Sequence, residues 1–196
     1  MFIQVIQAKS SRADELRALA ETWRDQDGAG AVGYLGGTYG VTDDGDFLAI
    51  VRFSSRDDAM ANSARPETGA FAEKMAALME GPPTFHDCGD VTTWLDGGSD
   101  DAGFVQVISG RVDDPAPIKA MATDTGDLRA MRPEIIGGTL AISDDGTFFQ
   151  TVYFTDEESA RKGEQIEPPE EIRADLESMM AGATFYDLHD PWFTSP

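Results

Sequence analysis

Polar and apolar positions along the chain follow the same order twice. The segment GGTYGVTDDGDFLAIVRF at Gly36–Phe53 returns as GGTLAISDDGTFFQTVYF at Gly137–Phe154, and FIQVI at Phe2–Ile6 returns as FVQVI at Phe104–Ile108. A period of about 100 residues is much longer than the repeat of a solenoid, so the pattern indicates two copies of one domain.

Alternating apolar residues within each copy predict strands, and apolar residues spaced by three or four predict amphipathic helices. In the first copy we expect a strand at Phe2–Ala8, a helix from Ser11 to the glycines of residues 28–33, two strands around Asp43–Gly45, a short helix from about Ser55, a helix at Glu67–Glu80 and a strand from Phe85. The Ser11 hydroxyl would cap the first helix, and the Gly-Pro-Pro that follows Glu80 ends the last one.

The second copy repeats the helical spacing. Its first helix is marked by Ile118, Met121 and Ala122, and its second by Ile172, Leu176, Met179 and Met180. Each copy therefore reads as strand, helix, strand, strand, helix, strand. Residues Asp96–Gly103 are small, acidic and without apolar periodicity, which is typical of a linker.

The two acidic DDG segments are expected to be hairpin turns. Asp43–Gly45 and Asp144–Gly146 each join two predicted strands, and the Asp-Gly pair supplies the positive φ that a tight reversal needs. A calcium loop is the alternative interpretation, but an EF-hand requires carboxylates at alternate positions and a glutamate at its twelfth position, between two helices. We therefore predict solvent-exposed turns.

The βαββαβ order in both copies, with FIQVI, GGT, DDG and TFHD (TFYD in the second copy), resembles the dimeric α+β barrel superfamily of ferredoxin-like domains. Within it the chain is similar to antibiotic-biosynthesis-monooxygenase-like proteins, including two-domain actinobacterial ones. The resemblance implies an α+β fold of two tandem ferredoxin-like repeats, 1–98 and 99–196, whose antiparallel sheets face each other. It also implies a pseudo-dimer within one chain, with a homodimer of chains as the alternative.

Charge narrows the choice of partners. The formal net charge is −21, and both copies are acidic, so no basic patch is available for nucleic acid or for an anionic membrane. The N-terminal segment has no signal-peptide pattern, no stretch is apolar enough to span a bilayer, and the single cysteine, Cys88, has no disulfide partner. We expect a cytoplasmic protein.

Positions where the two copies differ in chemistry are candidates for function, because the shared fold does not require them. Four such pairs are Trp23 and Thr125, Arg52 and Tyr153, Asn62 and Gly163, and His86 and Tyr186. Tryptophan, arginine, asparagine and histidine bind aromatic substrates and stabilise anions, and similar residue types serve the cofactor-free oxygenases that the chain resembles. All four lie in the first copy, so we expect any functional pocket to be formed more by residues 1–98 than by the second copy.

Each of these residues also has a structural interpretation. Trp23 lies on the apolar stripe of a helix and would pack in the core. Arg52 would be a solvated or ion-paired position on a strand, and Asn62 would help to end a short helix. His86 is the preferred catalytic candidate, as a base with Arg52 stabilising an anion. Its neighbour Asp87 points to the opposite face of a regular strand and so does not support it.

Gln4 and Gln106 are polar residues within the apolar first strand of each copy. If their face of the sheet lines the barrel, each copy contributes one amide to a mostly apolar interior, where it binds a ligand, water or a protein partner. The structural alternative is that the two amides pair with each other across the pseudo-twofold axis.

Metal and haem binding have weaker support. His86, Cys88 and Asp90 alternate along one predicted strand, but no matching cluster exists elsewhere. His86 could ligate haem without a motif in support, and no nucleophile-elbow sequence marks a serine hydrolase. His189 precedes Asp190, where Trp192 and Phe193 would pack between the copies.

Three classes of function remain open. The chain is a cofactor-free monooxygenase or isomerase acting on a small aromatic or polyketide-like compound, a noncatalytic protein that binds an apolar or aromatic metabolite, or a structural protein whose barrel is filled by side chains. We expect neither a cofactor nor a metal. The volume of the cavity separates the third class from the first two.

Overall fold

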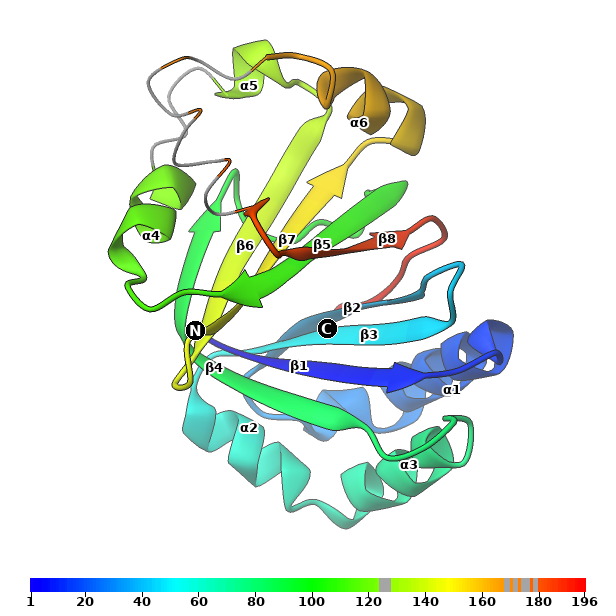
Figure 1. The fold of residues 1–196 in the computed structure, drawn as a ribbon. Coiled ribbons are helices and arrows are strands. Elements are labelled where there is room, and N and C mark those ends of the chain that lie inside the picture. The colour runs from blue at the N-terminus through cyan, green and yellow to red at the C-terminus, as the bar shows by residue number, and fades with distance from the viewer. Residues whose placement is uncertain (124–127, 168–169, 171–172, 174–176, 178–179) are drawn as a thin grey trace. The chain divides into compact units, whose positions relative to one another are not determined.

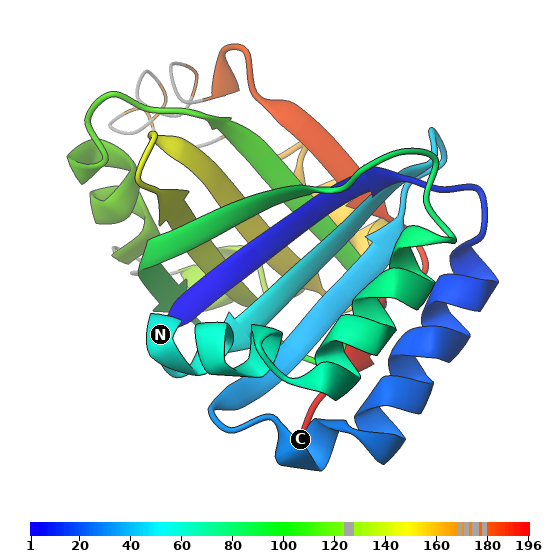
Figure 2. The same ribbon diagram turned by 90° about the horizontal axis from the view of Figure 1, so that it is seen from below.

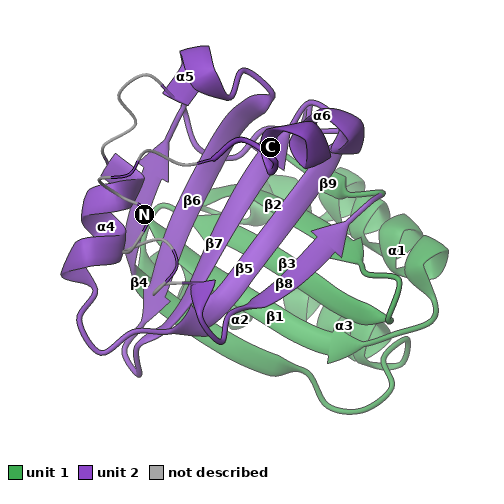
Figure 3. Ribbon diagram, turned by 45° about the horizontal axis from the view of Figure 1, so that its top comes forward, with its two compact units in different colours: residues 1–89, 190–196 green, residues 90–189 purple. Residues whose placement is uncertain are grey.

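The computed structural model of the protein describes residues 1–123, 128–167, 170, 173, 177 and 180–196. These residues form two compact units (Figure 3). Unit 1 contains Met1–Gly89 together with Asp190–Pro196, and unit 2 contains Asp90–His189. The units therefore do not coincide with the two sequence copies, because each copy gives its last segment to the other unit.

The elements follow the order expected from the repeat (Figure 1). The first copy contains β1 (Phe2–Lys9), α1 (Ala13–Gln26), the 3-10 helix η1 (Gly28–Gly30), β2 (Tyr34–Val41), β3 (Asp46–Phe53), α2 (Arg56–Ser63), α3 (Pro66–Ala76) and β4 (Thr84–Trp94). The second contains β5 (Phe104–Arg111), α4 (Ala116–Thr123), α5 (Leu128–Met131), β6 (Ile135–Ser143), β7 (Thr147–Phe154), α6 (Glu157–Gly163), β8 (Thr184–Leu188) and β9 (Trp192–Thr194). The predicted tandem ferredoxin-like α+β fold is confirmed. The helix expected around Ile172–Met179 lies largely outside the described residues.

Each unit contains one antiparallel sheet, and the long strand β4 contributes residues to both units. In unit 1 the strand order is β4-β1-β3-β2-β9, in unit 2 it is β8-β5-β7-β6-β4, and β4 belongs to both. The cause is the length of β4, which has 11 residues and continues past Gly89. Its second half extends unit 2, just as β9 extends unit 1 by pairing with β2.

Two helix boundaries differ from the sequence prediction. The first helix begins at Ala13, and its N-cap is Arg12 with no side-chain cap, so Ser11 does not cap it. The reason is that the neighbouring Ser10 hydroxyl accepts the Arg12 N–H. Helix α3 begins at Pro66 and ends at Ala76, four residues before Glu80, in a series of turns.

Other local predictions are confirmed. Ser55 caps α2 by accepting the Asp58 N–H through its hydroxyl. Gly45 and Gly146 have φ values of 80° and 83°, as the hairpin turns require, and the aspartates before them are exposed. Among the described residues, no helix is both long and apolar enough to cross a membrane.

Helices α1, α2 and α3 cover one face of the sheet of unit 1 (Figure 2). Residues from this face, such as Phe47 and Ala49 of β3, pack against Leu16 and Ala20 of α1. The alternate residues of the strands, including Ile3, Val5, Leu48 and Ile50, point to the other face and are also buried. Both faces of this sheet are therefore apolar, and only one of them is covered by helices of the same unit.

Candidate functional site

Unit 1 contains a cavity of about 280 Å³ between the helix-covered face of its sheet and helices α1, α2 and α3. Its wall is mainly aromatic and aliphatic, with Phe47, Val51, Phe53, Phe71, Met75 and Phe85 among the lining residues. Phe85 is 55% exposed, so the cavity reaches the surface beside β4. The lining residues all belong to the described part of the chain, and none of them is charged.

Three of the residues singled out in the sequence meet at this cavity. Trp23 comes from α1, Asn62 from α2 and Gln4 from β1. Trp23 packs its ring against Tyr34 and Phe71, with centroids 5.1 and 5.7 Å away. The core-packing interpretation of Trp23 and its place in a pocket wall are therefore both realised.

The polar atoms of these three residues are only partly paired. The Trp23 indole N–H is buried and has no hydrogen-bond partner. Asn62 accepts from Arg65 and from Thr68 through Oδ1, at 3.2 and 3.4 Å, which leaves its amide N–H groups unpaired among the described residues. Gln4 donates to Asp87 Oδ1 at 2.9 Å. The wall therefore holds two N–H donors without a protein partner.

Arg52 and His86 lie on the opposite face of the same sheet. Arg52 is 7% exposed and donates to Thr38 at 3.0 Å. The His86 imidazole contacts the side chain of Gln7 at 3.0 Å, and Asp87 bonds to Gln4 across the sheet, as strand alternation requires. Neither residue lines the cavity. The structure thus separates the expected base and anion stabiliser from the three residues at the cavity.

Two tyrosines that the sequence analysis did not select also line the cavity. Tyr34 donates to the Thr194 carbonyl at 2.7 Å and contacts the Thr194 hydroxyl, which in turn donates to Tyr39 at 3.2 Å. Burial raises the pKa of both tyrosines above the ordinary value, so their hydroxyls are neutral. The comparison of copies does carry a signal for them, because Ile135 and Leu140 stand at the matching positions.

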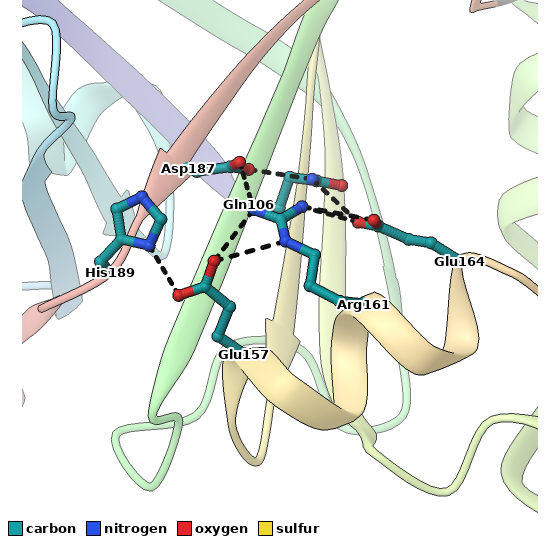
Figure 4. Close-up of polar contacts among 6 residues, drawn as sticks. All are labelled: Gln106, Glu157, Arg161, Glu164, Asp187 and His189. Atoms are coloured by element: carbon teal, nitrogen blue, oxygen red, sulfur yellow. Dashed lines mark hydrogen bonds and ion pairs between the residues drawn. The ribbon is translucent and has the colours of Figure 1, made fainter.

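Unit 2 has an ionic cluster around its own glutamine (Figure 4). Gln106 donates to Asp187 at 2.9 Å, so each glutamine pairs with the aspartate of the neighbouring strand and not with the other glutamine. Arg161 of α6 bonds to Asp187, Glu157 and Glu164, and its guanidinium lies 5.0 Å from the centre of the Phe104 ring.

The charges of this cluster shift the pKa values of its members. Burial alone would lower the pKa of Arg161, but the hydrogen bond and charge of Asp187, with the two glutamates, raise it instead. A hydrogen bond from His189, at 2.7 Å, lowers the pKa of Glu157. Arg161 matches Met60 of the first copy. In unit 1 the equivalent aspartate, Asp87, pairs with Arg56 at 3.8 Å, and Met60 is exposed. Thr125, the counterpart of Trp23, lies outside the described residues.

The alternating His86, Cys88 and Asp90 do not form a ligand set. Asp90 pairs with Lys119 at 2.8 Å, and no group of three His, Cys, Asp or Glu side chains suited to a metal occurs within the described ranges. In the segment around β9, Asp190 pairs with Arg17, and Trp192 stacks on Tyr39 of the first copy. The expected packing of Trp192 against the other copy is therefore confirmed.

Solved structures share this fold over nearly the whole chain. A candidate monooxygenase from Fusobacterium nucleatum is similar over 99% of this chain and 94% of that chain, with a TM-score of 0.75 and 11% identity. A candidate monooxygenase from Lactobacillus acidophilus is similar over 99% of this chain and 97% of that chain, with a TM-score of 0.70 and 15% identity. An anthrone oxidase-like protein is similar over 100% of this chain and 94% of that chain, with a TM-score of 0.63 and 10% identity. No family model and no curated protein matches the sequence. At these identities the likeness shows the fold alone.

Proposed function

We propose that unit 1 binds a small, neutral, aromatic compound that carries a carbonyl or similar oxygen acceptor. The observation that carries this proposal is a cavity of about 280 Å³ with a mainly aromatic wall, lined by Trp23 and Asn62, whose side-chain N–H groups have no partner among the described residues. A buried N–H without a partner, such as that of Trp23, is rare in proteins, and a ligand in the adjoining cavity would supply an acceptor.

Electrostatics favours a neutral ligand. An ionised group in this cavity would lose its hydration without gaining an opposite charge, because the lining has no charged side chain. The formal net charge of −21 further disfavours anions. Aromatic rings, in contrast, can pack edge to face against Phe71, Tyr34 and Trp23.

A matched pair of ligands tests the proposal. Isothermal titration of 1-tetralone and tetralin compares the same ring skeleton with and without a carbonyl oxygen. We expect 1-tetralone to bind more tightly to the wild type, and Trp23→Phe to remove about fivefold of that preference, because one hydrogen bond of about 1 kcal/mol is lost. Thr139→Val is the control, since the Thr139 hydroxyl is also buried and unpaired but belongs to unit 2. Equal binding of both ligands by the wild type would refute the proposal.

Cofactor-free oxygenation is the second candidate, and it is favoured by the fold shared with the candidate monooxygenases. Two N–H donors on one carbonyl oxygen would stabilise the enolate of an anthrone-like substrate, in the manner of an oxyanion hole. The carbanion form then reduces dioxygen: one oxygen atom enters the methylene carbon as a new carbonyl, and the other leaves as water with the two methylene hydrogens.

Oxygen uptake with anthrone tests this reaction. A catalysed conversion of anthrone to anthraquinone with equimolar oxygen consumption, lost in Asn62→Leu, supports it. Binding of 1-tetralone without any such turnover assigns unit 1 to noncatalytic binding. Arg52 and His86 have no role in either proposal, because their side chains lie on the other face of the sheet.

A further inference from the structure

Two tyrosines and one threonine, separated by up to 160 residues in the sequence, form a buried hydroxyl cluster beside the cavity. We call Tyr34, Tyr39 and Thr194 the hydroxyl triad. The Thr194 hydroxyl donates to Tyr39, the Thr194 carbonyl accepts from Tyr34, and the two tyrosine hydroxyls also hydrogen-bond to each other. Thr194 is fully buried, and both tyrosines line the cavity.

Two features of the backbone assemble the triad. The register between β2 and β3 shifts between Tyr34 and Gly36, and this bulge turns Tyr34 to the face that Tyr39 occupies. Strand β9 then pairs with β2, with Thr194 opposite Gly37. The third hydroxyl of the triad thus comes from the second sequence copy.

Arg17 of α1 holds the segment that precedes Thr194. Its guanidinium forms an ion pair with Asp190 at 3.0 Å, donates to the Asp190 and Pro191 carbonyls, and lies 5.3 Å from the centre of the Trp192 ring. Trp192 in turn stacks on Tyr39. Residues 190–194 therefore contact both helix α1, through Arg17, and the wall of the cavity, through Tyr39.

Unit 2 shows that the fold does not need these hydroxyl groups. The same bulge occurs between Ile135 and Gly137, and the counterparts of the triad are Ile135, Leu140 and Trp94. These three residues belong to one apolar cluster, and the Trp94 ring packs directly on Gly138. The same backbone thus accepts an apolar cluster, so the fold does not require the three hydrogen-bonded hydroxyls of unit 1.

We infer that Thr194 is a positioning residue for the cavity of unit 1, fixing through its hydroxyl and carbonyl the two tyrosine rings that form part of the wall. Aromatic ligands gain affinity from a wall that is already ordered, because less side-chain freedom is lost on binding. The first copy's site is on this view completed by the second copy. The inference rests on the proposed binding function.

The test compares two substitutions of equal size in buried threonines. Thr194→Val removes a bonded hydroxyl beside the cavity, and Thr139→Val removes a buried, unpaired hydroxyl in unit 2. In titrations with 1-tetralone we expect about tenfold weaker binding for Thr194→Val, unchanged binding for Thr139→Val, and recovery of most of the affinity in Thr194→Ser. Tyr39→Phe combined with Thr194→Val should weaken binding little more than either change alone, since both break one network.

The opposing outcomes separate this inference from the proposed function. If wild-type affinity persists in folded Thr194→Val, the positioning role is refuted while the binding function stands. If the wild type binds no 1-tetralone, the binding function is refuted. The positioning role of Thr194 is then tested by the tyrosine doublet in the Raman spectrum, which reports the hydrogen bonding of the tyrosine hydroxyls. A doublet that is the same in Thr194→Val and wild type then refutes the positioning role as well.

Discussion

Gly69 offers a way to close the cavity while making the protein more stable. It is the fourth residue of α3, it is exposed, and it lines the cavity. A Cβ atom added at Gly69 would meet no other atom within 4 Å. The Cβ of a larger residue therefore fits at this position, and we expect leucine to extend from it over the cavity.

The expected gain in stability follows from helix propensity. Replacing a helical glycine by alanine or leucine stabilises a helix by about 1 kcal/mol. For a chain of 196 residues this raises the unfolding temperature by about 3 °C. Gly69→Ala and Gly69→Leu should both show this gain in urea or thermal unfolding, because the added Cβ atom meets open space.

Ligand binding should distinguish the two variants. Gly69→Ala adds one methyl group and should keep the affinity for 1-tetralone, whereas Gly69→Leu should reduce it at least tenfold by occupying the volume that the ligand needs. Titration calorimetry on both variants and the wild type measures the difference. If Gly69→Leu is more stable than the wild type and still binds with wild-type affinity, the ligand does not use this cavity.

Three further substitutions test separate parts of the structure. Thr139→Val removes a buried hydroxyl without a partner and should raise the free energy of unfolding by about 1 kcal/mol, and a loss of stability in urea unfolding would contradict this. The His189 hydrogen bond holds the pKa of Glu157 in the folded protein below its ordinary value of 4.5. The ionised Glu157 therefore stabilises unit 2 above pH 4.5, and this stabilisation is lost as the pH falls through the lowered pKa. Glu157→Gln should flatten the acid side of the curve of unfolding free energy against pH, and an unchanged curve would refute the assignment. Gly36→Ala should cost at least about 2 kcal/mol in urea unfolding, because Gly36 has a φ of 121° and its Cβ would lie 2.7 Å from Arg52 Nη2; a variant as stable as the wild type would show that the bulge relaxes freely.

Local sequence signals predict the elements of this fold well. The Asp-Gly turns, the Ser55 cap and the alternating strands all depend on residues close together in the chain, and the structure contains each of them. Two of the four divergent positions, Trp23 and Asn62, line one cavity of unit 1 together with the shared Gln4. Shared positions reveal the fold, and divergent positions reveal where its two versions differ in chemistry.

The faces of the strands are decided only by tertiary structure. The alternation of side chains along a strand shows that Arg52 and His86 point to the opposite face from their strand neighbours, but it does not show which face the helices cover. The structure places both residues on the face away from the cavity. For Gln4 and Gln106 the outcome is similar, because each amide finds an aspartate on the next strand of its own unit.

Contacts between distant segments lie furthest from what the sequence shows. A bulge of one residue reverses the face of every side chain before it, and this shift is what brings Tyr34 to the side of Tyr39. Thr194 reaches the same place because β9 pairs with β2 and not with a strand of its own copy. Local patterns fix which residues form strands and turns, since those depend on neighbouring side chains and backbone conformation. Which strands pair, and what then lies against the cavity, depends on burying the apolar faces of the whole chain together.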